Sequence, residues 1–130
     1  KALNHDDQIA LRRIAPYLKN KPAVFDTVSI WDIMYLIANA RVYTGTSLHG
    51  AITAMSYAVP YVGLEVTKLN SYLNTWGIDG LDRIVALSEL ADGVQRAIHT
   101  DQLALDQSRT AQLEAAEASF FHIQKKVFSV

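Results

Sequence analysis

The sequence has no cysteine, and only three prolines and six glycines occur among its 130 residues. Without cysteine there is no disulfide scaffold, no Cys-ligated zinc site and no thiol nucleophile. An excess of one charge is also lacking, since 12 Lys and Arg face 13 Asp and Glu. Nucleic-acid-binding proteins normally carry a basic excess, so we expect no nucleic-acid partner. No apolar run approaches the roughly 18 residues of a membrane span, and we expect a protein of a reducing compartment, the cytoplasm.

What is present is a large apolar fraction, 50% of the residues. That fraction suits a single globular domain over 1–130 with a core of its own. The first residue is Lys1 rather than Met. We therefore expect the chain to be part of a longer protein.

Short apolar runs alternate with segments of helical period about four times along the chain. Strands are predicted at Ala23–Val28, Arg41–Thr44, Tyr61–Leu64 and Ile84–Leu87. The first predicted helix covers Asn4–Leu18, with Asp6 and Asp7 in its first turn, and the second follows a capping box of Ser29 and Asp32. The third begins at Thr46 or Ser47 and ends before Pro60. The fourth lies around Leu69–Trp76 and stops at Gly77, and the fifth follows Ser88. This alternation predicts an α/β fold, a Rossmann-like parallel sheet with helices on both faces. Such sheets bind ligands beyond the carboxyl ends of their strands.

The segment 102–127 has no strand signal and is predicted to be a terminal helix. Its apolar residues form a stripe over two heptads: Leu113, Ala116, Phe120, Ile123 and Val127. The stripe could pack on its own domain or cross to a partner domain or subunit.

Thr44, Gly45, Thr46 and Ser47 lie between a predicted strand and the helix beginning at Leu48. A helix N-terminus offers free N–H groups and a favourable dipole, and hydroxyls add donors, so an anion site is one interpretation. Routine helix capping by Thr or Ser is the other. The pattern lacks the second glycine and the lysine of the phosphate-binding P-loop.

His49 follows in the first turn of that helix. At 100° per residue, Leu48, Ala51, Ile52, Met55 and Val59 share the predicted core face. His49 points away from it, where it could bind phosphate, transfer protons or simply be solvated. Gly50 and Ala54 form a small-residue face that favours close packing over close ligand approach.

Lys68 and Glu65 follow the next predicted strand. Lys68 could reach a phosphate or carboxylate in the same crevice, although most such lysines are only solvated. Glu65 could act as a base or bind a sugar hydroxyl. His5, His99 and His122 have no metal-ligand spacing with an acid, so no metal and no cofactor are expected. Trp31 and Trp76 are interpreted as packing residues.

The run Thr44–Gly50, then Ala58-Val59-Pro60 and Lys68, resembles the polysaccharide pyruvyl transferase family, whose members typically show Arg-Leu-His-Gly or Arg-Leu-His-Ala at the opening of a helix. The segment from Ser29 to Ala40 looks like the family's preceding helix. The resemblance covers roughly 29–77. It implies a two-domain architecture like that of GT-B glycosyltransferases, of which this chain would be most of the C-terminal half, without its N-terminal domain.

The resemblance implies transfer of the enolpyruvyl carbons of phosphoenolpyruvate to a sugar of a surface polysaccharide or cell-wall precursor. His49 maps onto the motif histidine, which contacts the donor phosphate or transfers protons, and Lys68 maps onto the lysine after the next strand. On this reading the residues near His49 and Lys68 would bind the donor and the acceptor: Thr44, Gly45, Thr46, Ser47, Leu48, Gly50 and Glu65. A homo-oligomer fits this interpretation, and a lipid-linked acceptor would bring the protein to a membrane surface.

Ser47 departs from the family pattern, because it stands where the motif has Arg. A serine cannot offer a charged, bidentate fork to phosphate. Two other hypotheses therefore stay open: a GT-B glycosyltransferase that uses a nucleotide sugar, and a non-catalytic sugar-binding or assembly module. On the main hypothesis the chain is a transferase that is inactive by itself, because a GT-B-like site lies between two domains.

Overall fold

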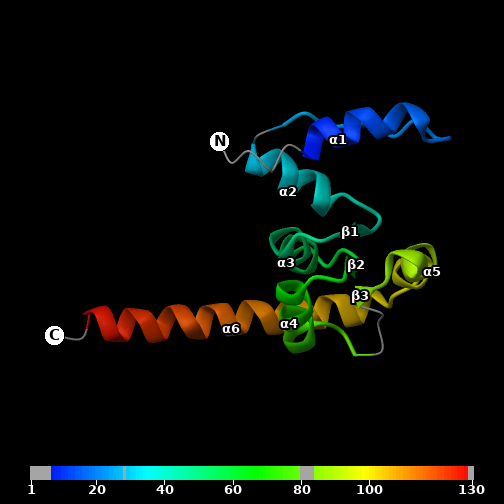
Figure 1. The fold of residues 1–130 in the computed structure, drawn as a ribbon. Coiled ribbons are helices and arrows are strands. Elements are labelled where there is room, and N and C mark those ends of the chain that lie inside the picture. Colours follow the sequence, from blue (N-terminus) through cyan, green and yellow to red (C-terminus); the bar gives the residue numbers. More distant parts are fainter. Residues whose placement is uncertain (1–6, 28, 80–83, 129–130) are drawn as a thin grey trace. The chain divides into compact units, whose positions relative to one another are not determined.

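A three-stranded parallel sheet organises the larger part of the chain in the computed structural model, which describes residues 7–27, 29–79 and 84–128 (Figure 1). The strands are β1 (Tyr43–Gly45), β2 (Tyr61–Leu64) and β3 (Ile84–Val85), in the spatial order β1-β2-β3. Tyr43 pairs with Tyr61, and Gly63 pairs with Ile84. The Rossmann-like α/β class predicted from the sequence is confirmed, with three strands in the described residues.

The chain divides into two units, Lys1–Ile33 and Met34–Val130. In the first, α1 (Asp7–Ile14) continues into a 3-10 turn, η1 (Ala15–Tyr17). The Arg12 guanidinium forms an ion pair with Asp26. The predicted helix start at Asn4 and Asp6 lies outside the described residues, as does His5.

The strand predicted at Ala23–Val28 is wrong for the described residues 23–27, which have no strand structure. β-Branched and aromatic composition favours extended backbone, but a strand also needs a hydrogen-bonded neighbour. Trp31 is also not a packing residue, since it is 73% exposed on α2 (Ile30–Ala38). The capping position at Ser29 is confirmed, because its hydroxyl accepts from the Asp32 N–H at 3.4 Å.

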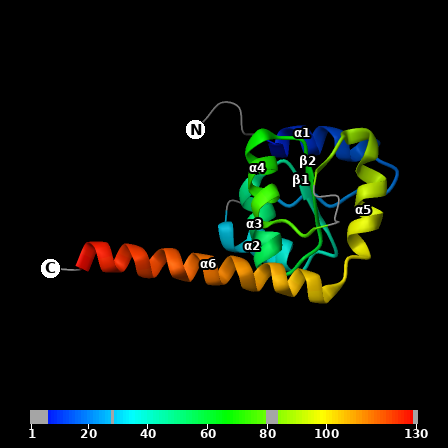
Figure 2. The same ribbon diagram turned by 90° about the horizontal axis from the view of Figure 1, so that it is seen from below.

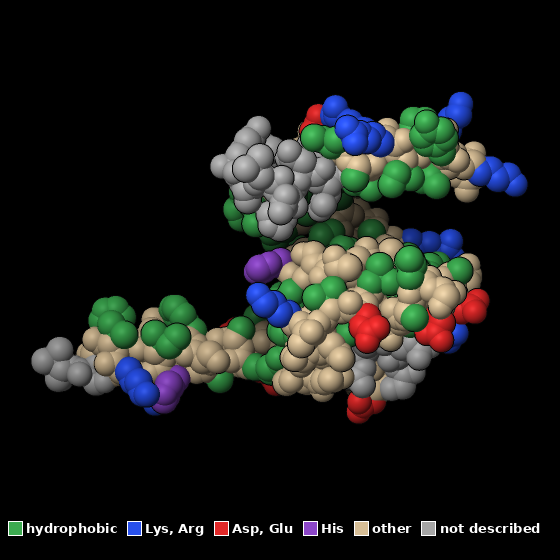
Figure 3. Space-filling model, viewed as in Figure 1, with side chains coloured by type: hydrophobic (Ala, Val, Ile, Leu, Met, Phe, Trp, Pro, Cys, Tyr) green, Lys and Arg blue, Asp and Glu red, His purple; other side chains and the backbone are tan. Residues whose placement is uncertain are grey.

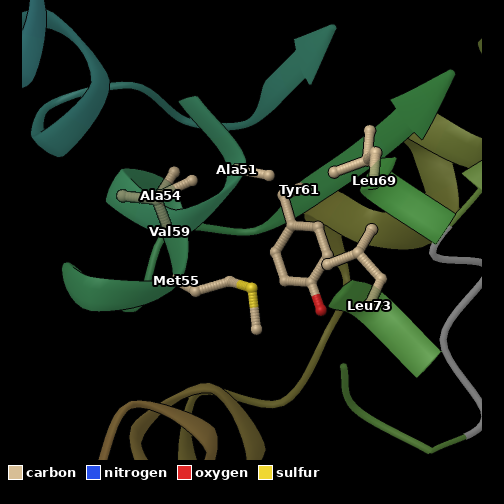
Figure 4. Close-up of a cluster of buried hydrophobic side chains, with 7 residues drawn as sticks. All are labelled: Ala51, Ala54, Met55, Val59, Tyr61, Leu69 and Leu73. Carbon is tan, nitrogen blue, oxygen red and sulfur yellow. The ribbon is translucent and has the colours of Figure 1, made fainter. Parts of the chain in front are cut away.

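The second unit builds its core on both faces of the sheet. On one face lie α3 (Leu48–Ser56) and α4 (Thr67–Trp76), with Tyr61 of β2 between them (Figure 4). On the other face α5 (Leu90–Ile98) packs against Val62 and Val85 (Figure 2). Because neighbouring residues of a strand point to opposite faces, Tyr61 packs into the core on the side of α3 and α4, and Val62 packs into the core on the side of α5.

The ends of the helices follow local signals in most places. The Gly77 N–H donates to the Leu73 carbonyl at 2.8 Å and closes α4, as predicted. The predicted cap at Ser88 is wrong, because Ser88 lies inside a 3-10 turn, η2 (Leu87–Glu89), and α5 begins only at Leu90. The residues that would form the first turn of a helix capped by Ser88 belong instead to this 3-10 turn.

The segment predicted to be a terminal helix is one continuous helix, α6 (Gln102–Phe128). It packs on α3 through its N-terminal half, where Leu105 is buried. None of the helices in the described ranges combines the length and apolarity that a membrane crossing requires.

Candidate functional site

The carboxyl ends of β1 and β2 form one edge of the sheet, and the chain leaves both strands there into helices. β1 ends at Gly45 and α3 begins at Leu48, while β2 ends at Leu64 and α4 begins at Thr67. Since the two strands are parallel neighbours, the N-termini of α3 and α4 lie at the same edge. His49 and Lys68 each occupy the second position of one of these helices.

Ser47 caps α3, as predicted. Its backbone is extended, and its hydroxyl accepts the N–H of Gly50 at 3.2 Å. This bond satisfies one of the free donors of the first turn. The Ser47 hydroxyl thus already has a partner in its own helix, and it brings no positive charge to the edge.

Tyr43 and Gly50 fix how the first turn of α3 sits on the sheet. The Tyr43 hydroxyl donates to the Ser47 carbonyl at 3.4 Å. A Cβ atom at position 50 would clash with the Tyr43 phenol, because it would lie 3.0 Å from Cε2 and closer than that to Cζ and the hydroxyl oxygen. Packing is therefore the reason for glycine at this position of the motif. Burial raises the pKa of the Tyr43 phenol, and the hydrogen bond to Ser47 partly opposes that rise.

The predicted core face of α3 is confirmed at Ala51 and Met55, which are 1% and 2% exposed. Ala54 is fully buried and belongs to the core as well. His49 is exposed, as its place on the helix predicts. The side chain that could do chemistry is thus separated from those that hold the helix in place.

Two charged residues of this edge, Lys68 and Glu65, are exposed. Neither Lys68 nor Glu65 forms an ion pair with any residue that the structure describes. Lys68 lies in the first turn of α4, where the helix dipole disfavours a cation unless an anion is near. Neither α3 nor α4 has an acidic residue in its first turn. The two helix N-termini therefore present free N–H groups at this edge, where Lys68 is the cation and Glu65 is the acid of the β2–α4 loop.

The remaining predicted site residues also lie along this edge. Thr44 and Thr46 are exposed, and Gly45 and Leu48 are half-buried. The other described histidines lie elsewhere, His99 at the C-terminal cap of α5 and His122 on α6. Within the described ranges no three His, Asp or Glu side chains come together to form a metal site.

The fold and its edge define a Rossmann-like α/β protein with polar residues at the carboxyl ends of its parallel strands. The family model of polysaccharide pyruvyl transferases matches residues 1–67, about half of the chain. The chain therefore belongs to the polysaccharide pyruvyl transferase family, as the motif around His49 predicted, and the family indicates a transferase. Lys68 lies one residue beyond the matched segment. Comparisons with curated proteins and with solved structures find no match.

Proposed function

We propose that the edge formed by α3 and α4 binds the phosphate of phosphoenolpyruvate during pyruvyl transfer to a sugar of a surface polysaccharide or cell-wall precursor. The observation that carries this proposal is the pair of helix N-termini, free of acids in their first turns, at the ends of adjacent parallel strands. His49 and Lys68 belong to those two turns. Backbone N–H groups, the helix dipoles and a cation all favour an anionic ligand.

In the proposed reaction His49 is the acid/base or the phosphate contact, and Lys68 is the charge partner. A proton adds to the methylene carbon of phosphoenolpyruvate, which leaves an electron-poor carbon at C2. One sugar hydroxyl forms a C–O bond to C2 and loses its proton. A second hydroxyl then loses its proton and forms a C–O bond to C2, while the bond between C2 and the phosphate oxygen breaks and inorganic phosphate leaves. Both sugar oxygens then hold the pyruvyl carbon as a ketal. Thr44, Thr46 and Glu65 supply polar groups for the sugar hydroxyls.

A second domain completes the site in this proposal. One helix N-terminus contributes about 0.3–1 kcal/mol toward an anion at an exposed position. Even millimolar binding needs about 4 kcal/mol. The Ser47 hydroxyl is engaged with Gly50 and cannot replace the Arg of the family motif. The acceptor contacts and further positive charge therefore come from an N-terminal domain in a GT-B-like arrangement.

A titration followed by backbone amide NMR tests the proposal on the 130-residue chain. Phosphoenolpyruvate should shift the amides of residues 47–50 and 67–69, with a dissociation constant in the millimolar range or weaker. His49→Ala and Lys68→Ala should each weaken these shifts. His99→Ala is the matched control for His49→Ala, because His99 is also exposed but lies at the C-terminal cap of α5.

A nucleotide sugar such as UDP-glucose serves as the competing probe. Shifts at residues 47–50 with UDP-glucose and none with phosphoenolpyruvate would replace the proposal by the glycosyltransferase hypothesis. Micromolar affinity for phosphoenolpyruvate in calorimetry would show that the site is complete within these residues, and the two-domain account would be wrong.

The engagement of Ser47 favours a second candidate function, a non-catalytic sugar-binding or assembly module. In that case a sugar, but neither donor, would shift the amides of this edge. The retention of both His49 and Lys68 favours the transferase instead.

A further inference from the structure

A surface hollow of about 450 Å³ lies within the second unit, between the C-terminal end of α4 and the N-terminal half of α6. The end of α4 contributes Thr75 and Trp76, and the chain that follows contributes residues 77–79. Four residues of α6 share one face of that helix and complete the lining: Ala104, Gln107, Ser108 and Ala111. We call this site the α4–α6 hollow. Its volume lies in the range of about 300–1,000 Å³ in which proteins bind small ligands.

The two walls of the α4–α6 hollow are fixed to each other by direct contacts. The Ser108 hydroxyl donates to the Trp76 carbonyl at 3.1 Å, and the Tyr72 hydroxyl donates to the Gln112 side-chain oxygen at 3.2 Å. Leu105, on the adjoining face of α6, is 2% exposed. Trp76 also packs against the buried cluster of α3 and α4. The hollow is therefore part of the packed structure of the second unit.

The polar groups of the hollow are mainly hydrogen-bond acceptors. Neither Asp79 nor Gln107 forms a hydrogen bond or an ion pair with any residue that the structure describes. The hydroxyls of Thr75 and Ser108 already donate to backbone carbonyls, at 3.3 and 3.1 Å, so they can only accept from a ligand. The Gly77 N–H is engaged in closing α4. The carboxamide of Gln107 is thus the free side-chain donor among several acceptor oxygens.

A hollow rich in acceptors selects a ligand that carries donors. The Asp79 carboxylate disfavours phosphates and other anions, and no Lys, Arg or His is among the described residues that line the hollow. Sugar hydroxyls donate to carboxylate and carboxamide oxygens and also accept from a carboxamide N–H. Trp76 and Ile78, both half-buried, add apolar surface on which the C–H face of a sugar ring can pack.

The surface over α4 agrees with a ligand of this kind. In Figure 3 it is mostly tan, the colour of uncharged polar side chains and backbone. An uncharged ligand with many hydroxyl groups therefore fits this surface better than a strongly charged one.

We propose that the α4–α6 hollow binds a neutral sugar residue, at a site separate from the candidate edge. Lys68 lies at the start of α4 and Trp76 at its end, eight residues later, which is about 12 Å along the helix axis. The inference does not depend on the proposed function, because it requires neither phosphoenolpyruvate nor group transfer. In a transferase that acts on a polysaccharide, this site would hold a sugar residue at a distance from the reacting one.

Backbone amide NMR of the 130-residue chain tests the inference with four probes: the methyl glycosides of glucose, galactose and mannose, and N-acetylglucosamine. At least one of them should shift the amides of residues 75–79 and 104–111 saturably, with a dissociation constant of about 1–10 mM. The phosphoenolpyruvate titration reports instead on residues 47–50 and 67–69. The inference and the proposed function can therefore fail separately.

Two substitutions remove hydrogen-bonding groups from the hollow. Asp79→Ala and Gln107→Ala should each raise the dissociation constant of the sugar at least about threefold, the loss expected for one hydrogen bond. Gln95→Ala is the matched control for Gln107→Ala, because Gln95 is an equally polar, exposed residue on α5 and lies outside the hollow. It should leave the dissociation constant unchanged.

A third substitution fills the hollow. Ala111→Phe places a ring at an exposed position of its lining and should abolish the saturable shifts. Ala118→Phe is the matched control, since it adds the same ring to α6 about two turns further on, outside the hollow. Circular dichroism of both variants checks that the helix content is unchanged.

Four results would overturn the inference. The first is the absence of a saturable shift with all four sugars up to about 50 mM. The second is unchanged sugar binding in Ala111→Phe or in both alanine variants. The third is a set of sugar shifts confined to residues 47–50 and 67–69, which would locate the sugar at the candidate edge. The fourth is a saturable shift of the hollow by tetramethylammonium but by no sugar, which would assign the Asp79 carboxylate and Trp76 to a cation instead.

Discussion

Gly50, in the first turn of α3, lies against the phenol of Tyr43 at the start of β1. A side chain at position 50 would occupy the space of the Tyr43 ring and hydroxyl. The Leu-His-Gly turn that carries His49 is thus held against the sheet by a strand residue seven positions earlier. Gly50 therefore allows the first turn of α3 to pack closely on the sheet, and this packing determines where His49 lies.

Replacing Gly50 by alanine should therefore destabilise the protein, although alanine is the better helix former. We expect a loss of about 1–3 kcal/mol, typical of overpacking, measured by urea unfolding. Tyr43→Val in the same chain should recover part of this loss, because it removes the ring that the new methyl group meets. Strictly additive effects of the two substitutions would show that Gly50 and Tyr43 are not coupled.

Met55 and His49 should respond very differently to substitution. Met55→Asp places an unpaired carboxylate in the core and should cost several kcal/mol, on the order expected for a buried charge. His49→Ala removes an exposed side chain and should change stability by about 0.5 kcal/mol or less. Thermal melts of the two variants provide the comparison. Similar losses in both would contradict the assignment of the helix face.

Ala58 follows α3 in the left-handed region, with φ of 52°. The Val59 N–H donates to the Ala54 carbonyl at 2.8 Å, and the Ala58 N–H donates to the Met55 carbonyl at 3.0 Å, which together close the helix. Glycine normally occupies such a position because it has no Cβ. Ala58→Gly should raise the free energy of unfolding by about 0.5–1 kcal/mol, despite the lost methyl group. A decrease in chemical-denaturation experiments would show that burial of the methyl group outweighs the backbone strain.

Tyr43 should make stability depend on pH in the alkaline range. Its pKa in the folded protein lies above the ordinary value of 10.0, because burial disfavours the phenolate. The unfolded chain therefore releases this proton first as the pH rises. The contribution to stability is full below pH 10 and is lost as the pH rises toward the folded-state pKa.

Urea unfolding of the native chain and of Tyr43→Phe from pH 8 to 11 measures this effect. The variant should lose less stability above pH 10, while its loss of the hydrogen bond to Ser47 should be a constant offset at lower pH. The burial that raises the pKa of Tyr72 is present in both proteins and cancels from the difference. Parallel curves for the two proteins would contradict the prediction.

Much of the second unit could be predicted from the sequence because its signals are local. The cap at Ser47, the stop at Gly77 and the buried face of α3 depend on residues a few positions apart. The parallel sheet followed from the alternation of strands and helices, since each crossover returns the chain in the same direction. The motif around His49 also indicated the family that the comparison found.

Other features were decided by contacts between residues far apart in the chain. Residues 23–27 have strand composition but no strand structure, and Trp31 is exposed although its type favours burial. The need for glycine at position 50 depends on the ring of Tyr43, which belongs to another element. The apolar spacing along the terminal helix was visible as a pattern, but only the structure showed that Leu113, Phe120 and Ile123 are exposed there. Periodicity and capping act within one or two helical turns, whereas sheet pairing and burial depend on what the rest of the fold places beside each residue.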